Sequence, residues 1–437
     1  MNLERAVAEA SVIFRTAVRA ADPEVLVRGS LHLDGSVLAV GGRTYALPRH
    51  ARLFVIAIGK AAVPMARGAL AALGTRIDDG LLVTKRVTAD AVAHVGSLQV
   101  VHGSHPVPDG TSEEAGRRLL ALARGLEPQD LVLVLISGGG SALVEAPIDG
   151  ITLSDIAATT DALLRAGADI GALNAVRRRL SRLKGGGLAR AIAPARVINL
   201  IISDVLGSPL PAIASGPTVA DDESAPDPTA VVTALGVSGR IPAPVRAALA
   251  APRAAGAPMA NVLDSLVLAD ASTAARAASL AAQHLGYTPA VLATDFSGET
   301  REFARFWAAL ARQDRRAGAP FPLPACLIGT GETTVTVRGR GIGGRNTEMA
   351  TAAALAIEGI EGIAIASLAT DGDDGLSDAA GGVVVGSSLA RARDAGVHGQ
   401  AALDANDTAR FLAAAGGLLV TGPTGTNVND LYLALLP

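Results

Sequence analysis

Short apolar runs and stretches of helical periodicity alternate along the first half of the chain. Runs at 52–58, 131–136 and 196–202 lack polar alternation. This is typical of strands buried on both faces of a parallel sheet, although periodicity alone does not exclude a helix. Further strands are predicted over 80–84 and 97–101, and helices over 2–21, 64–73, 111–124 and 153–183. Thr111 and Glu114 predict a capping box at the third helix. The alternation predicts an α/β domain with a mainly parallel sheet.

The second half repeats the alternation after a proline-rich stretch over 208–244. Helices are predicted over 272–285 and 299–313, and strands over 265–269, 289–293, 325–328, 333–338, 362–369 and 382–385. A chain of 437 residues also exceeds the roughly 250–300 residues that one core supports. We therefore predict two domains, one over residues 1–240 and one over 241–437.

Composition narrows the class of protein. With 49% hydrophobic and 18% charged residues, the chain is globular. A net charge of −3 without a lysine-rich block argues against a nucleic-acid partner. The single cysteine, Cys326, excludes an intrachain disulfide and fits a reducing cytoplasm. No apolar run approaches the ~18 residues of a membrane span, and the N-terminal segment lacks a signal-peptide core. We expect a cytoplasmic protein without a membrane partner, and the sequence leaves a homodimer open.

A glycine-rich turn follows the apolar run at 131–136. Its residues are Ser137, Gly138, Gly139, Gly140 and Ser141. Three glycines remove every Cβ from the bend, so a ligand can approach the backbone N–H groups, and helix-compatible sequence follows. This pattern favours phosphate or carboxylate binding, although such turns also occur where a helix packs close to a sheet. It is not a Walker A loop.

Charged residues follow other predicted strands of the first half. Lys60 comes directly after the run at 52–58, at the sheet end where open α/β folds bind ligands. Asp204 ends the strand at 196–202 and could hold Mg²⁺, although turn aspartates are equally frequent there. Lys184 and Gly185 open a second glycine cluster, which suits an anion contact or a helix junction.

Two polar segments of the second half also invite a chemical interpretation. Asp371 belongs to a cluster of three aspartates at the end of the strand at 362–369, and it is a candidate general base or metal ligand. Residues 339–344 satisfy the dinucleotide pattern Gly-x-Gly-x-x-Gly. The charged and polar residues that follow, at 345–348, argue against a nicotinamide site.

Ten segments in order resemble the class II glycerate 2-kinases, the family with a C-terminal MOFRL domain. They are IGKAA (58–62), SHPVPD (104–109), ISGGGSAL (136–143), LKGGGLA (183–189), SDVLG (203–207), IASGPT (213–218), GETTV (331–335), GGRNTE (343–348), ATDGDDG (369–375) and TGPTGTNVND (421–430). The chain departs from the usual family pattern at 269–272 and 329–334, which puts local contacts there in question.

The resemblance implies a fold and a reaction. The fold is two α/β domains, a Rossmann-like N-terminal domain and a smaller MOFRL-type domain, with a cleft between them. The reaction is the ATP-dependent phosphorylation of D-glycerate at its 2-hydroxyl, with Mg²⁺. A reading of the chain as a hydroxypyruvate reductase that uses NAD(P)H remains the alternative enzyme, and a non-catalytic binding protein is a third reading.

The resemblance also implies roles for individual residues. The family's proposed catalytic residues fall on Lys60, Arg345 and Asp371. We assign phosphate binding to the turn at 137–141 with Lys184 and Gly185, and glycerate binding to Arg345, Asn346 and Glu348. Asp204 and Asp373 are the predicted metal ligands.

Overall fold

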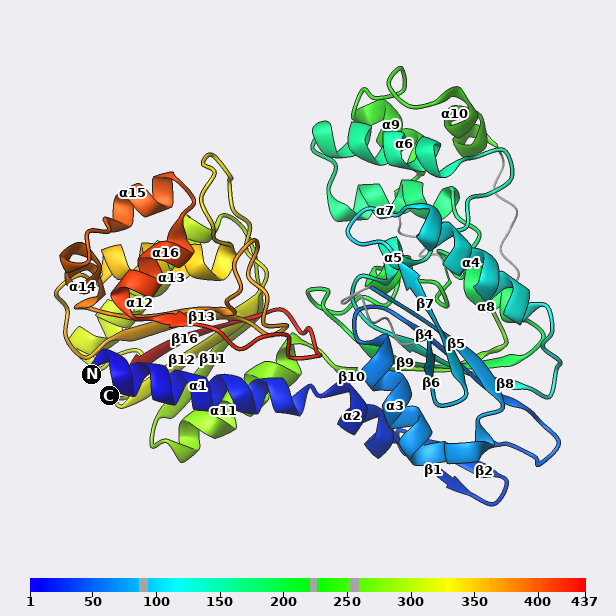
Figure 1. Cartoon of the computed structure of the whole chain (residues 1–437), viewed down its shortest axis with the longest axis horizontal. Helices are drawn as coiled ribbons and strands as arrows, with labels where there is room; N and C mark the ends of the chain where they lie inside the picture. The colour runs from blue at the N-terminus through cyan, green and yellow to red at the C-terminus, as the bar shows by residue number, and fades with distance from the viewer. Residues whose placement is uncertain (86–92, 221–225, 252–258) are drawn as a thin grey trace. The chain divides into compact units, whose positions relative to one another are not determined.

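The computed structural model describes residues 1–85, 93–220, 226–251 and 259–437 (Figure 1). The chain forms two compact units, unit 1 over Met1–Asp22 with Ala269–Pro437, and unit 2 over Pro23–Leu268. This division differs from the predicted one at residue 240 in two respects. The N-terminal helix belongs with the C-terminal half, and the change from one unit to the other lies between Leu268 and Ala269.

Unit 2 contains most of the first half of the chain. Its elements are α2 (Pro23–Ser30), β1 (Leu31–Asp34), β2 (Val37–Val40), β3 (Arg43–Ala46), β4 (Leu53–Ile58), α3 (Ala62–Leu73), β5 (Asp79–Lys85), β6 (His94–Val95), β7 (Leu98–Gly103), α4 (Gly110–Ala123), β8 (Leu131–Ile136), α5 (Gly140–Leu143), α6 (Leu153–Arg165), α7 (Ile170–Arg179), α8 (Gly187–Ile192), β9 (Arg196–Ile202), α9 (Pro228–Ala234), α10 (Ala243–Ala250) and β10 (Val262–Ala269). The strands predicted at 52–58, 131–136 and 196–202 are confirmed as β4, β8 and β9.

The main sheet of unit 2 has the order β10-β9-β8-β4-β5-β7-β6 within the described residues. Strand β4 pairs in parallel with both β5 and β8, and the pairs β5–β7 and β8–β9 are also parallel. When the six longer strands are numbered along the chain, their order is 3-2-1-4-5-6, which is that of doubly wound nucleotide-binding sheets. The predicted Rossmann-like fold is confirmed.

Complete burial of the central strands explains why their sequences are continuously apolar. Every residue of β4 and β8 is buried, because helices cover the sheet and side chains of α4 and α8 join the strands in one core. A second core lies among α6, α7, α9 and α10, which form a helical subdomain of unit 2 (Figure 1). Helix α4 begins one residue earlier than predicted, because Asp109 and Ser112 form its capping box in place of Thr111 and Glu114.

Unit 1 contains the N-terminal helix and most of the second half of the chain. Its elements are α1 (Leu3–Ala20), α11 (Ala271–His284), β11 (Thr288–Phe296), α12 (Thr300–Ala317), β12 (Ala325–Gly331), α13 (Arg345–Ala356), β13 (Ala364–Ala369), β14 (Gly381–Val385), α14 (Ser388–Asp394), α15 (Gly399–Asp404), α16 (Thr408–Ala415), β15 (Leu418–Leu419) and β16 (Asp430–Leu436). The strand predicted over 265–269 is β10, which joins the sheet of unit 2.

The sheet of unit 1 is mixed, with the order β11-β12-β16-β13-β14-β15 in the described chain. Strands β11 and β12 are parallel, whereas β16 runs antiparallel between β12 and β13. The prediction of a strand at 333–338 is wrong, because this segment makes only an isolated bridge between Thr334 and Glu299.

No helix in the described ranges has the length and apolar character that crossing a membrane requires.

Replacement of Phe14 tests the assignment of the N-terminal helix to unit 1. Phe14 is 2% exposed, and α1 packs against α11 and β14. We expect Phe14→Ala to cost about 3–5 kcal/mol of stability through the cavity it leaves. Hydrogen exchange should accelerate in α11 and β14 and stay unchanged in β4 and β8. Val12→Ala, at a 41% exposed position of the same helix, is the control. Acceleration centred on β4 and β8 would contradict the assignment.

Candidate functional site

The carboxyl ends of the parallel strands bring several predicted site residues to one edge of the unit 2 sheet. Lys60 follows β4, the glycine turn at 137–141 follows β8, and Asp204 follows β9. Chain connections lead from β4 in one direction along the sheet and from β8 in the other. The gap between β4 and β8 is therefore the topological switch point, where open α/β sheets bind ligands.

Hydrogen bonds join the turn after β4 to the turn after β8. The Lys60 N–H donates to the Gly138 carbonyl at 2.9 Å, and the Ala61 N–H donates to Ser137 Oγ at 3.0 Å. Gly59 has a φ of +132°, and a Cβ there would lie 2.2 Å from Ser137 Oγ. Ser137 is only 2% exposed. Its hydroxyl holds the two turns together, whereas the predicted role was to face a ligand.

The three glycines let other groups pack against the turn itself. A Cβ on Gly138 would lie 1.7 Å from the Asp204 carboxylate. Gly139 has a φ of +82°, and a Cβ there would come within 3.3 Å of both the His105 ring and Lys60 Cγ. Lys60 and Asp204 are thus brought together around this turn, as predicted. The helix that follows, α5, has four residues.

Ser141 belongs to a chain of hydrogen-bonded side chains. Ser215 Oγ donates to Asn174 Oδ1 at 3.1 Å, and Ser141 Oγ lies 2.7 Å from Ser215 Oγ. Because a hydroxyl has one proton and Ser215 gives its proton to Asn174, Ser141 is the donor to Ser215. Ser141 can then offer only lone pairs to a ligand. This arrangement suits a cation better than the phosphate oxygen that was predicted.

His105 belongs to this site, although it was not among the predicted site residues. Burial, together with the nearby charges of Lys60 and Lys85, lowers its pKa to about 4. The imidazole is therefore neutral at pH 7 and can act as a hydrogen-bonding group beside Gly139. Its position after the strand at 97–101 was the available signal, because that strand runs parallel to β5 and ends at the same edge.

Lys184 and Gly185 do not act as predicted. Lys184 is 3% exposed and forms a buried ion pair with Glu145. Burial lowers the pKa of Lys184, while the charge of Glu145 opposes the shift. The Gly185 N–H donates to the Ser215 carbonyl at 3.0 Å. Lys184 is therefore committed to Glu145, and the Gly185 N–H is committed to the Ser215 carbonyl.

In unit 1, Arg345 lies between two carboxylates. It is the first residue of α13 and binds Asp430 through Nε and Nη2, at 2.5 and 3.1 Å. Its Nη1 donates to Glu332 Oε1 at 2.9 Å. Burial raises the pKa of Asp430 to about 6 against the opposing charge of Arg345. Burial also works against the charge of Arg345, but Asp430 and Glu332 hold its pKa above the usual value. The pair is ionised at neutral pH.

The three clustered aspartates have different environments. Asp371 follows β13, is partly exposed, and accepts a hydrogen bond from the Asp373 N–H at 3.1 Å. Asp374 is buried and accepts the N–H groups of Asn346 and Thr347, each at 2.8 Å. It therefore stabilises the N-terminus of α13. Asp430 pairs with the last residues of both β12 and β13. Because Arg345 binds Asp430 and Asp371 follows β13, Arg345 and Asp371 lie at the same edge of the sheet.

Two predicted substrate ligands are structural residues. Asn346 is fully buried, and its amide bonds to Asp374 and Ser367. Glu348 is 1% exposed and forms an ion pair with Arg301 at 2.8 Å. The assignment of glycerate binding to Asn346 and Glu348 is corrected accordingly, because neither side chain is accessible.

The glycines of the dinucleotide pattern at 339–344 pack against the turn at 405–407. A Cβ on Gly339 would lie 2.0 Å from the Ala405 carbonyl, and one on Gly341 would lie 2.4 Å from Asp407 Cβ. The N–H groups of Arg338 and Gly339 both donate to Asn406 at 2.8 Å. These glycines allow a close approach of protein backbone, and no strand precedes them in this described segment.

No group of three or more His, Cys, Asp or Glu residues in the described ranges could hold a metal ion by itself. Magnesium in nucleotide sites usually needs only one or two carboxylates in addition to phosphates and water. Asp204, packed on the glycine turn, has the chemistry of such a ligand. Asp373 is exposed, and its metal role stays a prediction.

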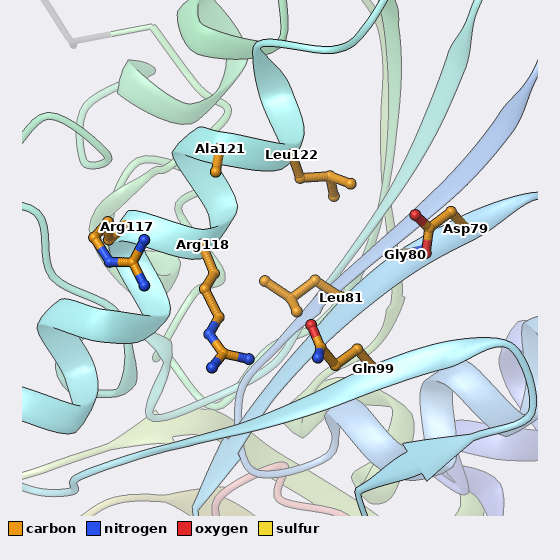
Figure 2. Close-up of a pocket in the computed structure, with 8 residues that line it drawn as sticks. All are labelled: Asp79, Gly80, Leu81, Gln99, Arg117, Arg118, Ala121 and Leu122. Atoms are coloured by element: carbon orange, nitrogen blue, oxygen red, sulfur yellow. The ribbon is translucent and has the colours of Figure 1, made fainter.

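A separate pocket of about 390 Å³ opens on unit 2 (Figure 2). Arg117 and Arg118 project into this region from α4, and Gln99 projects from β7. Both arginines form ion pairs with Glu114. The pocket involves the first residues of β5 and β7, and therefore lies at the sheet edge opposite Lys60 and the glycine turn.

The neutral His105 makes a prediction about acid stability. Its pKa is about 4 in the folded chain against an ordinary value of 6.5. The unfolded chain therefore takes up a proton between pH 6.5 and 4 that the folded chain excludes, and stability falls as the pH is lowered through this window. His105→Gln should remove about 1–2 kcal/mol of this loss, allowing for solvent screening.

Urea unfolding at pH 7 and pH 4.5 measures the difference. His50→Gln, at an exposed position, is the control and should lose stability as the unmodified chain does. An equal loss in His105→Gln and the unmodified chain would show that the folded protein accepts the proton.

Known proteins resemble the chain over almost its whole length. The family model described as a domain of unknown function (DUF4147) matches residues 9–250, and the MOFRL family model matches 325–430. A D-glycerate 2-kinase of Thermotoga maritima is 40% identical, over 88% of this chain and 91% of that protein. A putative hydroxypyruvate reductase of Agrobacterium vitis is also 40% identical, over 97% and 93% of the two chains. The crystal structure of a Thermotoga maritima glycerate kinase superposes with a TM-score of 0.86 and 36% identity, over 99% and 100% of the two chains. The chain therefore belongs to the family of glycerate kinases with a C-terminal MOFRL domain.

Proposed function

We propose that this protein transfers the γ-phosphoryl group of ATP to the 2-hydroxyl of D-glycerate, giving 2-phosphoglycerate and ADP. Its glycerate kinase relatives support the reaction class. The observation in this chain that carries the proposal is the junction of Lys60 with the glycine turn at the switch point of a doubly wound sheet. This is where nucleotide phosphates bind in such sheets.

In this proposal, unit 2 binds the phosphate groups of ATP. Lys60 is exposed and provides a compact positive charge for a phosphate oxygen. Gly138, Gly139 and Gly140 leave the backbone of the turn open to close approach. The neutral His105 adds a hydrogen-bonding group without adding charge. Phosphoryl transfer depends mainly on such positioning and charge neutralisation, because its transition state is loose and anionic.

Magnesium is the cation that we expect beside the nucleotide, and the chemistry of the unit 2 residues fits it. Asp204 packs against Gly138, and Ser141 presents lone pairs because its proton goes to Ser215. Oxygen ligands of these two kinds are those that Mg²⁺ prefers. When bound with ATP, the ion neutralises charge on the β- and γ-phosphates. We assign Asp204 and Ser141 to hold it.

In this proposal, the residues of unit 1 bind and deprotonate the acceptor, D-glycerate. Asp371 takes the proton of the glycerate hydroxyl while the oxygen of that hydroxyl forms a bond to the γ-phosphorus. The bond between that phosphorus and the bridging oxygen breaks, and ADP leaves with the electron pair. Arg345 pairs with an anionic group of the reactants, since its planar guanidinium suits a carboxylate or a phosphoryl group. Holding the two reactants in line can supply effective molarities on the order of 10⁵–10⁸ M.

Reduction of hydroxypyruvate is the weaker alternative, although relatives carry that name. It requires a nicotinamide site, and the dinucleotide pattern at 339–344 was the sequence feature that favoured one. The glycines of this pattern contact the turn at 405–407 instead. We also propose a cytoplasmic location, which the presence of a single cysteine, Cys326, supports.

Replacement of Lys60 and Asp371 tests the proposal. We expect Lys60→Ala and Asp371→Asn each to lower kcat by about 10²–10⁴-fold, because one removes charge stabilisation and the other the proton acceptor. ADP release from ATP and D-glycerate measures the rate, and circular dichroism checks the fold. Arg67→Ala and Asp378→Asn, at exposed positions nearby in sequence, are matched controls that should retain activity. Near-normal kcat in both site variants would refute the assigned roles.

A further inference from the structure

Arg345 has two counter-ions of very different character. Asp430 is fully buried and binds Nε and Nη2 with both of its oxygens. Such a bidentate pair fixes the plane of the guanidinium as well as its position. Asp430 is also held in place itself, since it begins β16 and pairs with Gly331 of β12 and Ala369 of β13. The sheet thereby determines where Arg345 points.

Glu332 is the second counter-ion and is far more exposed. It lies 2.9 Å from Nη1, and its side chain is 46% exposed, against 29% for Arg345 and 0% for Asp430. Its other oxygen is 3.4 Å from Asn429 Nδ2. Exposed ion pairs contribute little to stability, whereas removal of one partner from a buried pair is costly. An incoming anion can therefore replace Glu332 at Nη1 but cannot replace Asp430.

We propose that Asp430 is a positioning residue for Arg345, and that Glu332 occupies the place on Nη1 that the substrate carboxylate takes. This inference rests on the proposed function. The carboxylate is favoured over a phosphoryl group because Arg345 and Asp371 share one edge of the unit 1 sheet. In a 2-hydroxy acid, the hydroxyl that gives its proton to the base is on the carbon next to the carboxylate. Arg345 and Asp371 thus match this class of substrate.

Two variants separate the roles of the two counter-ions. Glu332→Gln removes a competing anion, so the KM for D-glycerate should fall by about two- to fivefold while the KM for ATP stays unchanged. Asp430→Asn leaves Arg345 without its charged anchor, so kcat should fall by roughly 100-fold, as misplaced catalytic groups do. Because Asp430 acts through Arg345, adding Asp430→Asn to Arg345→Lys should cost little more than Arg345→Lys alone.

A second arginine of unit 1 provides a matched control. Arg301 also binds one buried carboxylate, Glu348, and lies near one exposed carboxylate, Asp404, which is 65% exposed. Asp404→Asn should change neither KM, because Arg301 has no role in the reaction. A change like that of Glu332→Gln would show a general effect of surface charge and overturn the inference.

Each remaining outcome decides between distinct conclusions. An unchanged or raised KM for D-glycerate in Glu332→Gln would overturn the exchange of Glu332 for substrate, even if Asp430→Asn fails to fold. A lowered KM for ATP alone would overturn the choice of the carboxylate. Full activity in Arg345→Lys would instead contradict the role of Arg345 in the proposed function.

Discussion

The parallel pairing of β4 with β8 is the constraint on which the chemistry of unit 2 depends. It places two turns side by side at the switch point, and Ser137 and the Lys60 N–H then connect them. Gly59 is required there, since any Cβ would collide with Ser137. The exposed position of Lys60 and the close packing of other groups on the glycine turn follow from this local geometry.

In unit 1, the main constraint is the repulsion among neighbouring carboxylates. This unit gathers several carboxylates at one sheet edge, where their mutual repulsion would be costly without compensation. Arg345 neutralises Asp430 and Glu332, and Asp374 is stabilised by the N-terminus of α13. Asp371 is left partly exposed at the same edge. The charges that maintain the fold thus also orient the groups assigned to catalysis.

The sequence predicted the buried strands, the mainly parallel sheet and the turns at Lys60 and 137–141, because each depends on a local pattern. The sequence led to wrong roles for several residues, which were predicted to bind ligands but bond to side chains distant in the chain. Lys184 pairs with Glu145, and Asn346 bonds to Asp374, and neither contact leaves a signal in the spacing of residues. Burial decides whether a polar side chain serves the fold or a ligand, and a motif does not reveal burial.

The strand predicted at 333–338 failed for a similar reason. Its alternating pattern resembles a strand, but the segment continues into glycines that pack on the turn at 405–407. The same contact removes the apparent dinucleotide motif. Tertiary packing therefore overrode both the local propensity and the short motif.

Identification of the phosphorylated product tests the central claim most directly. The protein would be incubated with ATP, Mg²⁺ and D-glycerate, and the product analysed by phosphorus NMR with coupling to the carbon-bound proton. A base and an arginine at one sheet edge, matched to a hydroxyl beside a carboxylate, predict 2-phosphoglycerate. Formation of 3-phosphoglycerate, or no phosphorylated glycerate at all, would contradict the account.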